Sequence, residues 1–469
     1  MKQMFTVPDY LPDQTPNSGT LEGLKNAFPI VRGYAPVRDF QSVSDTITGD
    51  FLGGTAVIAN DGTSYLLVGT TTSLLRYSSG SWTTLVSGLS IEDQWRFVGF
   101  GDYVVAVNGS ETYEVDLNAG TASPIAGAPA GKSVTVVGDY VVIGQSVNNL
   151  INVQTSEIND HTEWNPVNGA TIQPQLTGGE VMGLSGGEYG VILQRQRIVR
   201  QARTGNADLP FEYDPITDNV GCASKGSVVT HGRSTFFLSD QGFGSIEDGQ
   251  AWVPIGTEKV DRTFQELVPT DDYDRIFSAI DPVRKLAIWC VPGSPGFLFI
   301  YNYELQKWGI AELPVEGIFS AFTSSETLEG VSVEYPDLDA MPVSLDDPIF
   351  SGGNPQLYVV QDGQIGTLSG ETLEAVFEFG FVELAPGNRA RLRHVRPITD
   401  STQTQVDVKV SERQGDEGVK VDGGALRASG RISLRASGRY HQLTWTEPAG
   451  SRWSYVHAFE LEYASGQGR

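Results

Sequence analysis

The string Gly-Asp-Tyr-Val-Val occupies residues 101–105 and occurs again at residues 138–142. A related string, Gly-Thr-Ser-Tyr-Leu-Leu-Val, occupies residues 62–68, so a tyrosine recurs at positions 65, 103 and 140. Steps of 38 and 37 residues match one four-stranded blade of a β-propeller, which takes about 40 residues. The repeat therefore predicts a chain built from stacked blades.

Each copy opens with a turn pair, Asp61-Gly62, Gly101-Asp102 or Gly138-Asp139, and continues with β-branched and aromatic residues. This pattern is typical of a hairpin that leads into a buried strand. More divergent units follow at wider spacing, at residues 188–193, 234–238, 285–289 and 356–368. We expect an all-β protein with a propeller of about six blades, in which the last hairpin and an early strand close the ring.

The chain divides into three parts. Residues 1–45 are rich in proline and predict an extended N-terminal arm. Residues 46–374 hold the propeller, with an acidic inserted loop at 324–353. Residues 375–469 carry longer alternating strands, such as 376–379, 406–410 and 459–463, which predict a β-sandwich.

The arm carries apolar residues for which a solvated linker would have little use. We therefore expect it to dock on a neighbour, with an arm that stays disordered in solvent as the alternative. The candidate contact residues are Tyr10, Leu21, Leu24 and Phe28.

The charge of the chain is uneven. Residues 387–469 hold 13 Lys and Arg against 9 Asp and Glu, whereas the rest of the chain holds 19 and 48. An acidic propeller repels nucleic acid, because phosphate-binding surfaces need Lys and Arg. The charge is compatible with a wall past which DNA slides without adhering, and equally with a solvated surface that only aids solubility.

The basic part contains an internal duplication. Leu-Arg-Ala-Ser-Gly-Arg occupies residues 426–431 and again 434–439. Its arginines predict a basic ridge that faces an acidic partner, with solvated turn residues as the alternative. The members of this candidate ridge are Arg427, Arg431, Arg435 and Arg439.

Cysteine content and hydropathy restrict the class of protein. Cys222 and Cys290 form no CxxC motif and are expected to be buried as small apolar residues. The N-terminus lacks the apolar region of a signal peptide, and no apolar run approaches the ~20 residues that span a bilayer. These features predict a soluble protein with no membrane insertion.

The order of these parts resembles the tail nozzle or tail hub proteins of short-tailed bacteriophages, also called packaged-DNA stabilisation proteins. The resemblance rests on the layout and on short strings at residues 26–29, 198–201, 285–289, 298–302, 307–308, 345–348 and 438–443. It implies a structural virion protein, made in the bacterial cytoplasm, that forms a ring, usually of six copies. The implied neighbours are portal and adaptor proteins above and tail fibre, spike or needle proteins, with DNA leaving through the channel.

Catalytic motifs give no positive signal. Glycosidase chemistry on a propeller needs paired carboxylates, for which Asp240 and Glu247 are candidates, although turn carboxylates are ordinarily solvated. The five histidines form no HExxH, and no Walker A or regular calcium loop occurs. We therefore expect no enzymatic activity, metal or cofactor. The alternative function is a propeller-based carbohydrate-binding or glycan-cleaving host-recognition protein, in which Tyr440, Trp445, Trp453 and Tyr455 would stack on sugars.

Overall fold

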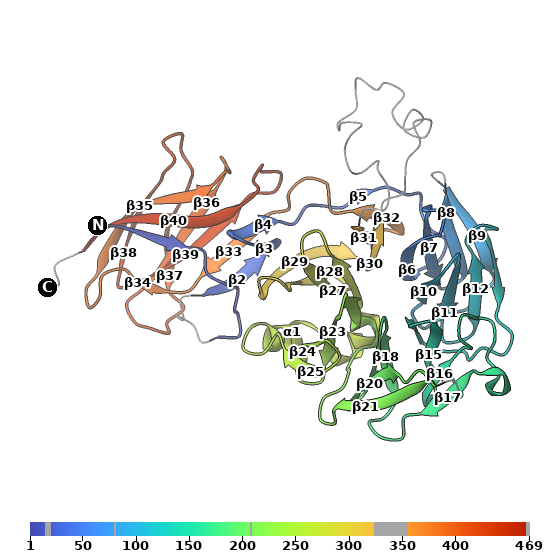
Figure 1. The fold of residues 1–469 in the computed structure, drawn as a ribbon. Coiled ribbons are helices and arrows are strands. Elements are labelled where there is room, and N and C mark those ends of the chain that lie inside the picture. The colour runs from blue at the N-terminus through green and yellow to red at the C-terminus, as the bar shows by residue number, and fades with distance from the viewer. Residues whose placement is uncertain (15–19, 79–80, 207–208, 323–354, 466–469) are drawn as a thin grey trace.

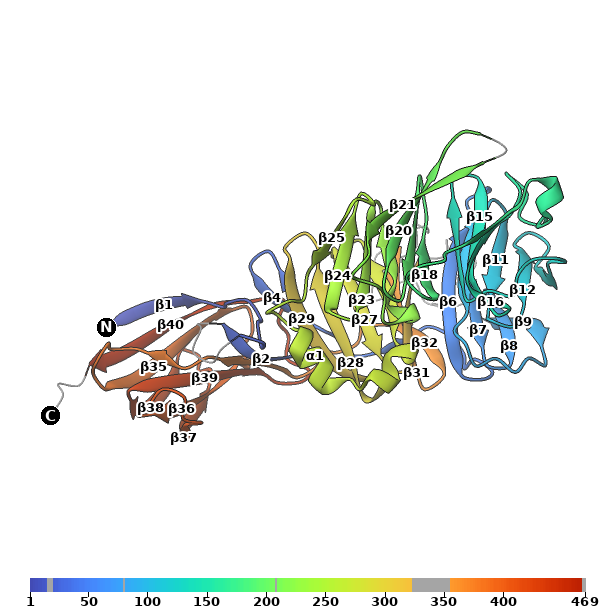
Figure 2. The ribbon, with the colours of Figure 1, turned by 90° about the horizontal axis from the view of Figure 1, so that it is seen from below.

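The computed structural model describes residues 1–14, 20–78, 81–206, 209–322 and 355–465. Nearly all of its regular structure is β-strand, with a seven-residue helix α1 (Asp261–Leu267) and three 3-10 turns, η1 (Pro166–Asn168), η2 (Lys225–Ser227) and η3 (Thr270–Arg275), in those ranges. Figures 1 and 2 show a β-propeller at one end of the molecule and a β-sandwich at the other. The predicted fold class is confirmed.

Four antiparallel strands form each of the first four blades. The sequence repeat falls on the first three of them. The strands are β6 (Phe51–Ile58), β7 (Ser64–Thr70), β8 (Ser73–Ser78) and β9 (Ser81–Ser87); β10 (Arg96–Phe100), β11 (Tyr103–Val107), β12 (Thr112–Asp116) and β13 (Thr121–Pro124); β14 (Ser133–Val137), β15 (Tyr140–Ser146), β16 (Asn149–Thr155) and β17 (Thr171–Pro174); and β18 (Val181–Ser185), β19 (Gly190–Gln194), β20 (Ile198–Arg203) and β21 (Phe211–Thr217).

Three further blades complete the ring, so the described residues form seven blades where the spacing predicts about six. Their strands are β22 (Val229–His231), β23 (Ser234–Ser239), β24 (Gly242–Glu247) and β25 (Ala251–Pro254); β26 (Phe277–Asp281), β27 (Leu286–Val291), β28 (Gly293–Asn302) and β29 (Lys307–Val315); and β30 (Gly317–Phe322), β31 (Pro355–Gln361), β32 (Gln364–Thr367) and β5 (Gln41–Ser42).

The ring closes as the sequence predicts, with an early strand beside a late hairpin. Thr367 pairs with Gln41, which makes β5 the outer strand of the last blade. On the inside, β30 lies against β6, and the rings of Phe51 and Phe319 stack with centroids 5.8 Å apart. Apolar contacts between these two blades hold the closure, since each blade face is buried only against its neighbour.

The repeated string forms the turn from the innermost strand of a blade to the second strand. Gly62, Gly101 and Gly138 adopt positive φ values of 87°, 62° and 60°, a backbone region that glycine enters without steric cost. The Val-Val pair that follows is fully buried in both exact copies. The turn sequence therefore fixes where the second strand of each of these blades begins.

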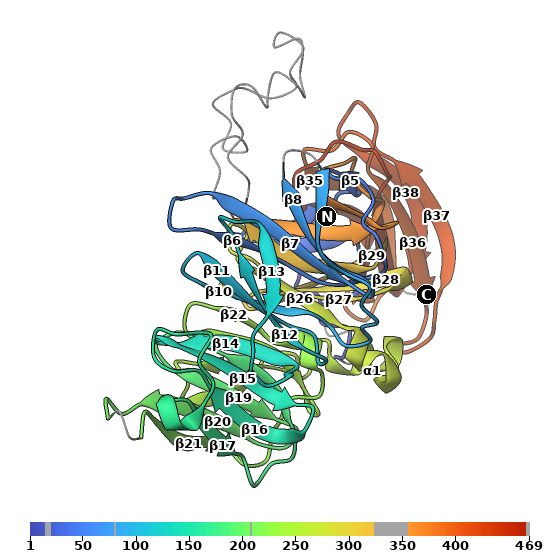
Figure 3. The ribbon, with the colours of Figure 1, turned by 90° about the vertical axis from the view of Figure 1, so that its right-hand side faces the viewer.

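Two sheets form the sandwich. One contains β33 (Ala375–Phe379), β34 (Val382–Glu383), β36 (Gln405–Ser411), β37 (Val419–Ala425) and β39 (Tyr440–Glu447), and the other contains β35 (Ala390–Thr399), β38 (Ile432–Gly438) and β40 (Val456–Ser465). Phe377, Trp445 and Phe459 pack edge to face between the sheets, as alternating strands require. In Figure 3 the strands β36, β37 and β38 lie to the right of the blades.

The N-terminal segment is not the separate arm that its prolines predict. It supplies β1 (Lys2–Thr6), β2 (Leu21–Lys25), β3 (Ala27–Ile30), β4 (Gly33–Pro36) and β5. The strands β1 and β2 pair with β40 and β33 of the sandwich, whereas β3 meets β29 of the sixth blade. Pairing within the chain satisfies the backbone hydrogen-bonding groups of these strands. The strands therefore connect the propeller to the sandwich.

Three further predictions concern the cysteines, membrane-spanning segments and the inserted loop. Cys222 and Cys290 are both fully buried thiols, as predicted. Among the described residues, no helix is long and apolar enough to cross a membrane. The predicted insertion at residues 324–353 lies outside the described residues.

Candidate functional site

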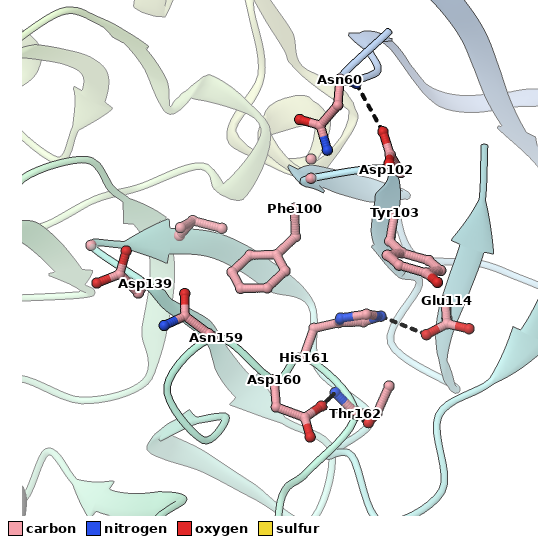
Figure 4. Close-up of a pocket in the computed structure, with 14 residues that line it drawn as sticks. Asn60, Phe100, Asp102, Tyr103, Glu114, Asp139, Asn159, Asp160, His161 and Thr162 are labelled. Atoms are coloured by element: carbon pink, nitrogen blue, oxygen red, sulfur yellow. Dashed lines mark hydrogen bonds and ion pairs between the residues drawn. The ribbon is translucent and has the colours of Figure 1, made fainter. Parts of the chain in front are cut away.

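One cavity lies where three copies of the repeated turn come together. It has a volume of about 710 Å³. Its walls come from the turns 99–103 and 138–139, the loop 159–162, Asn60 and Glu114. Three turns thus contribute to the walls: β6–β7, β10–β11 and β14–β15. We call this cavity the inter-blade pocket (Figure 4).

Three aromatic rings meet in this pocket. The ring centroid of His161 lies 4.8 Å from that of Tyr103 and 5.6 Å from that of Phe100, with tilted planes in both pairs. His161 comes from the loop that follows β16, whereas the other two rings end β10 and begin β11. The second and third blades therefore build this aromatic cluster together.

Hydrogen bonds fix the histidine. Its Nε2 atom lies 2.5 Å from Oε2 of Glu114 on β12, and its carbonyl oxygen accepts a hydrogen bond from Nε1 of the buried Trp164 at 2.9 Å. A ring that is held at both its side chain and its backbone has one orientation, so the aromatic cluster is preorganised.

Polar groups surround the rings. The backbone N–H of Asn60 donates to Oδ1 of Asp102 at 2.8 Å, and Nη1 of Arg203 donates to Oδ2 of Asp139 at 2.8 Å. The amide side chains of Asn60 and Asn159 make no hydrogen bond to other described residues. Figure 4 shows Asn60 and Asp102 on one side of Phe100, with Asp139 and Asn159 on another.

Asp160, in the loop that carries His161, has a lowered pKa. The side-chain and backbone donors of Thr162 bind Oδ1 of Asp160 at 2.6 and 2.9 Å. These hydrogen bonds hold the pKa of Asp160 below its usual value. The carboxylate therefore stays charged and acts as an acceptor that stiffens the loop.

A smaller cavity of about 120 Å³ is lined by the innermost strands β6, β10, β26 and β30, a space that holds a few water molecules. Nη2 of Arg96 on β10 donates to the carbonyl oxygen of Lys225 at 3.1 Å and to Oε1 of Gln94 at 2.7 Å. Burial lowers the pKa of Arg96 to about 10, so its charge persists at neutral pH.

The four arginines of the predicted ridge do not form one compact patch. Arg427 lies in the turn between β37 and β38, Arg435 lies on the outer face of β38, and Arg439 follows that strand. Arg431 approaches Glu462 at 3.8 Å. Because β38 is extended, Arg431 and Arg439 are separated by roughly 27 Å along it.

Two arginines that the sequence did not single out join Arg435. Arg391 pairs with Ser437 across the β35–β38 register, and Arg393 lies at the bulge opposite residues 434–435. All three side chains are exposed, and Arg391 and Arg435 are diagonal neighbours on one sheet face. We call the exposed set Arg391, Arg393, Arg435 and Arg439 the basic strip. None of the four forms an ion pair with a described carboxylate.

The predicted arm contacts are used inside the chain. Tyr10, Leu21 and Leu24 are 4%, 0% and 8% exposed within the chain's own core, and Phe28 packs against the propeller core. Their apolar surface is already buried by β33, β40 and the sixth blade. The prediction that Tyr10, Leu21, Leu24 and Phe28 contact a neighbouring subunit is therefore wrong.

The candidates for glycan chemistry are also dispersed. Asp240 lies in the turn before β24 and Glu247 is the last residue of that strand, so they are too far apart to flank one glycosidic bond. Trp445 and Trp453 are core residues at 1% and 4% exposure, whereas Tyr455 is exposed. No group of three or more His, Cys, Asp and Glu side chains within the described ranges is arranged to hold a metal ion.

Sequence reasoning missed the inter-blade pocket. Glu114 and His161 are 47 residues apart and belong to different blades, so no local motif joins them. The available signal was the repeat itself, because successive copies of one turn must lie side by side on one face of a propeller.

No protein-family model matches the chain, and no curated protein matches it. Among solved structures, the extracellular domain of a hybrid two-component system of B. thetaiotaomicron gives a TM-score of 0.44 at 10% identity, over 76% of this chain and 42% of that one. The WD40 repeats of RRP9 give a TM-score of 0.35 at 8% identity, over 60% and 89%. The chain thus spans less than half of the first of these proteins, and similarities of this size carry no argument about function.

Proposed function

We propose that this protein is a non-enzymatic structural subunit that assembles head to tail into a ring at the distal end of a phage tail or head-to-tail connector. The observation that carries the proposal is the separation of charge along one elongated chain. Residues 1–386 hold 48 Asp and Glu against 19 Lys and Arg, whereas the sandwich carries the unpaired basic strip.

The register of the sandwich locates the basic strip at the end remote from the propeller. Thr399 pairs with Val456, which also pairs with Tyr34 of the connecting hairpin. Ala390 pairs with Ser465 at the other end of these strands. Arg391 and Arg439 therefore lie near the end of β35 and β38 that is beside the end of β40, and Figure 1 shows the C-terminus on the side of the sandwich away from the blades.

A molecule with an acidic propeller and a basic strip on its sandwich favours contact between these unlike surfaces of two copies. Such a head-to-tail contact is heterologous, and it generates a ring when the rotation closes. The strands β1–β4 join sandwich and propeller through backbone pairing, which favours a fixed angle per subunit. A fixed angle per subunit is what a closed ring of defined size requires.

In such a ring the genome would pass between the subunits. The cavity between the innermost strands β6, β10, β26 and β30, about 120 Å³, is far too small for a duplex whose major groove alone is about 12 Å wide. An acidic inner wall would let DNA pass without sequence-specific adhesion. Portal or adaptor proteins above and tail fibre, spike or needle proteins are the neighbours that the sequence resemblance suggests.

The experiment is the mass of the purified full chain by light scattering, from 1 to 100 µM, combined with negative-stain imaging. We expect discrete closed rings, which by the resemblance contain six copies. A strict monomer over the whole range, with no rings in the images, would overturn the proposal. Deleting residues 1–45 is unsuitable as a test, because it removes core residues such as Leu21 and Tyr34.

The alternative function, a propeller-based carbohydrate-binding protein for host recognition, is favoured by one observation. The inter-blade pocket combines aromatic rings with carboxylate and amide groups in a volume of about 710 Å³, which is within the range of small-molecule sites. A monomer that binds a glycan would favour this alternative over the ring.

A further inference from the structure

The inter-blade pocket has features of a built ligand site that a structural role does not require. Its three rings come from two blades, and Glu114 and Trp164 hold His161 in place. The loop that carries His161 is fixed as well, because the backbone N–H of Asn159 donates to the carbonyl oxygen of Asp139 at 2.8 Å. The pocket is therefore shaped before any ligand arrives.

The carboxylates around the pocket all have hydrogen-bond partners. Arg203 pairs with Asp139, and Nε2 of His161 is hydrogen-bonded to Glu114. Asp102 and Asp160 already accept hydrogen bonds from Asn60 and Thr162. These carboxylates retain acceptor lone pairs for hydroxyl groups, and their negative charge disfavours an anionic ligand.

Donors are present beside these acceptors. Asn60 and Asn159 line the pocket, and each amide offers two N–H donors and one acceptor. Amide and carboxylate groups that alternate around aromatic faces match a molecule with many hydroxyl groups and apolar C–H faces. Tyr103 and Phe100 are half-buried, so part of each ring remains available for contact with such a face.

We infer that the inter-blade pocket binds a neutral saccharide of one or two sugar rings, stacked on Tyr103 or Phe100 and hydrogen-bonded by Asn60, Asp102 and Asn159. The inference concerns binding alone, with no bond cleavage. It deepens the alternative function given above by naming the ligand class and its contacts, and because it lies within one chain it does not depend on ring assembly.

The repeat supplies a matched control for the test. Tyr65 occupies the same repeat position as Tyr103 one blade earlier, is half-buried like it, and does not line the pocket. Instead it packs beneath the guanidinium of Arg76, 4.4 Å from the ring centroid. Tyr103→Ala and Tyr65→Ala therefore remove the same side chain inside and outside the pocket.

The experiment is saturation-transfer difference NMR on the full chain with maltose, cellobiose, lactose and N,N′-diacetylchitobiose, followed by titration of any sugar that binds. We expect at least one sugar to bind saturably, and Tyr103→Ala to weaken its affinity about tenfold while Tyr65→Ala leaves it unchanged. Asn60→Ala, at an exposed turn residue, should weaken affinity severalfold and serves if Tyr103→Ala fails to fold.

Three results would overturn the inference. One is that none of the four sugars binds to the wild-type chain at 10 mM. Another is that a sugar binds but neither Tyr103→Ala nor Asn60→Ala weakens it, which would locate the sugar elsewhere. The third is saturable binding of tetramethylammonium without binding of any sugar, which would assign the pocket to a cation held by the aromatic rings.

Discussion

The side-chain oxygen of Asn26 accepts a hydrogen bond from the backbone N–H of Glu312, at 2.8 Å. The amide nitrogen of the same side chain donates to the carbonyl oxygen of Glu374, also at 2.8 Å. Glu312 belongs to the sixth blade, whereas Glu374 immediately precedes the sandwich. One buried amide therefore joins the N-terminal segment, the propeller and the sandwich.

Asn26 also has a φ of 55°, in the left-handed region that Asn and Gly tolerate best. Asn26→Ala should remove both hydrogen bonds and strain the backbone, and we expect a loss of about 2–4 kcal/mol of unfolding free energy. Asn26→Gly keeps the backbone conformation and should lose less. Urea unfolding of both variants checks this, and equal losses would show that the left-handed conformation contributes nothing.

Glu447 is a fully buried carboxylate in the sandwich. It accepts hydrogen bonds from Ser401, Thr404 and Trp445 at 2.6, 2.6 and 2.7 Å. Glu447→Ala leaves these donors without an acceptor, and we expect a loss of roughly 2–4 kcal/mol in urea unfolding. Glu447→Gln keeps a carbonyl acceptor and should lose less than half of that amount.

The pH dependence of this site has a definite sign. Burial raises the pKa of Glu447 above its usual value of 4.5, so the folded state favours the protonated acid. The resulting contribution to stability is fully present below pH 4.5 and is lost as pH rises through the folded pKa. Glu447→Gln should remove this loss, and melting temperatures of both proteins between pH 4 and 8 measure it. Parallel curves would contradict the assignment.

Ionisation of Asp261 should make the stability of the propeller depend on pH as well. It lies in the first turn of α1 against Gly242 and Gly256, where an added Cβ would come within 2.2 and 1.9 Å of its carboxylate. Burial raises its pKa to about 6, so its protonated form stabilises the fold below pH 3.8 and that stabilisation is lost by pH 6. We expect Asp261→Asn to raise the melting temperature above pH 6 but not at pH 4. Asp240→Asn, at an exposed turn, is the control and should change neither.

The predictable part of this fold was the part encoded locally. Turn glycines and β-branched runs repeat within each blade, so the blades and the sandwich strands follow from short windows of sequence. The N-terminal strands could not be predicted in this way, because their partners are hundreds of residues away: Leu21 pairs with Phe379 and Lys2 with Glu462. Pairing at such separation leaves no periodic signal, and the prolines suggested an isolated arm instead.

The duplicated hexapeptide shows why local sequence is not sufficient. Residues 426–431 form a turn with Ala428 exposed, whereas the identical residues 434–439 continue β38 with Ala436 fully buried. Only the second copy lies beside β35, which offers both backbone partners and an apolar face. Neighbouring strands therefore decided the conformation, and they also brought Arg391 and Arg393 beside Arg435.

The basic strip gives the sharpest test of head-to-tail assembly. Arg435→Glu reverses one charge on the outer face of β38, and we expect it to reduce ring formation, because the strip would then repel the acidic end of the next copy. The effect should be largest at 20–50 mM salt and small near 1 M, where the screening length falls to about 3 Å. Arg452→Glu is the matched control, since Arg452 is equally exposed in the sandwich but follows Gly450, which bonds to the propeller-side residue Thr372. Light scattering of the three proteins at each salt concentration measures the assembled fraction. If both variants assemble like the wild type at every concentration, the basic strip is not the contact surface.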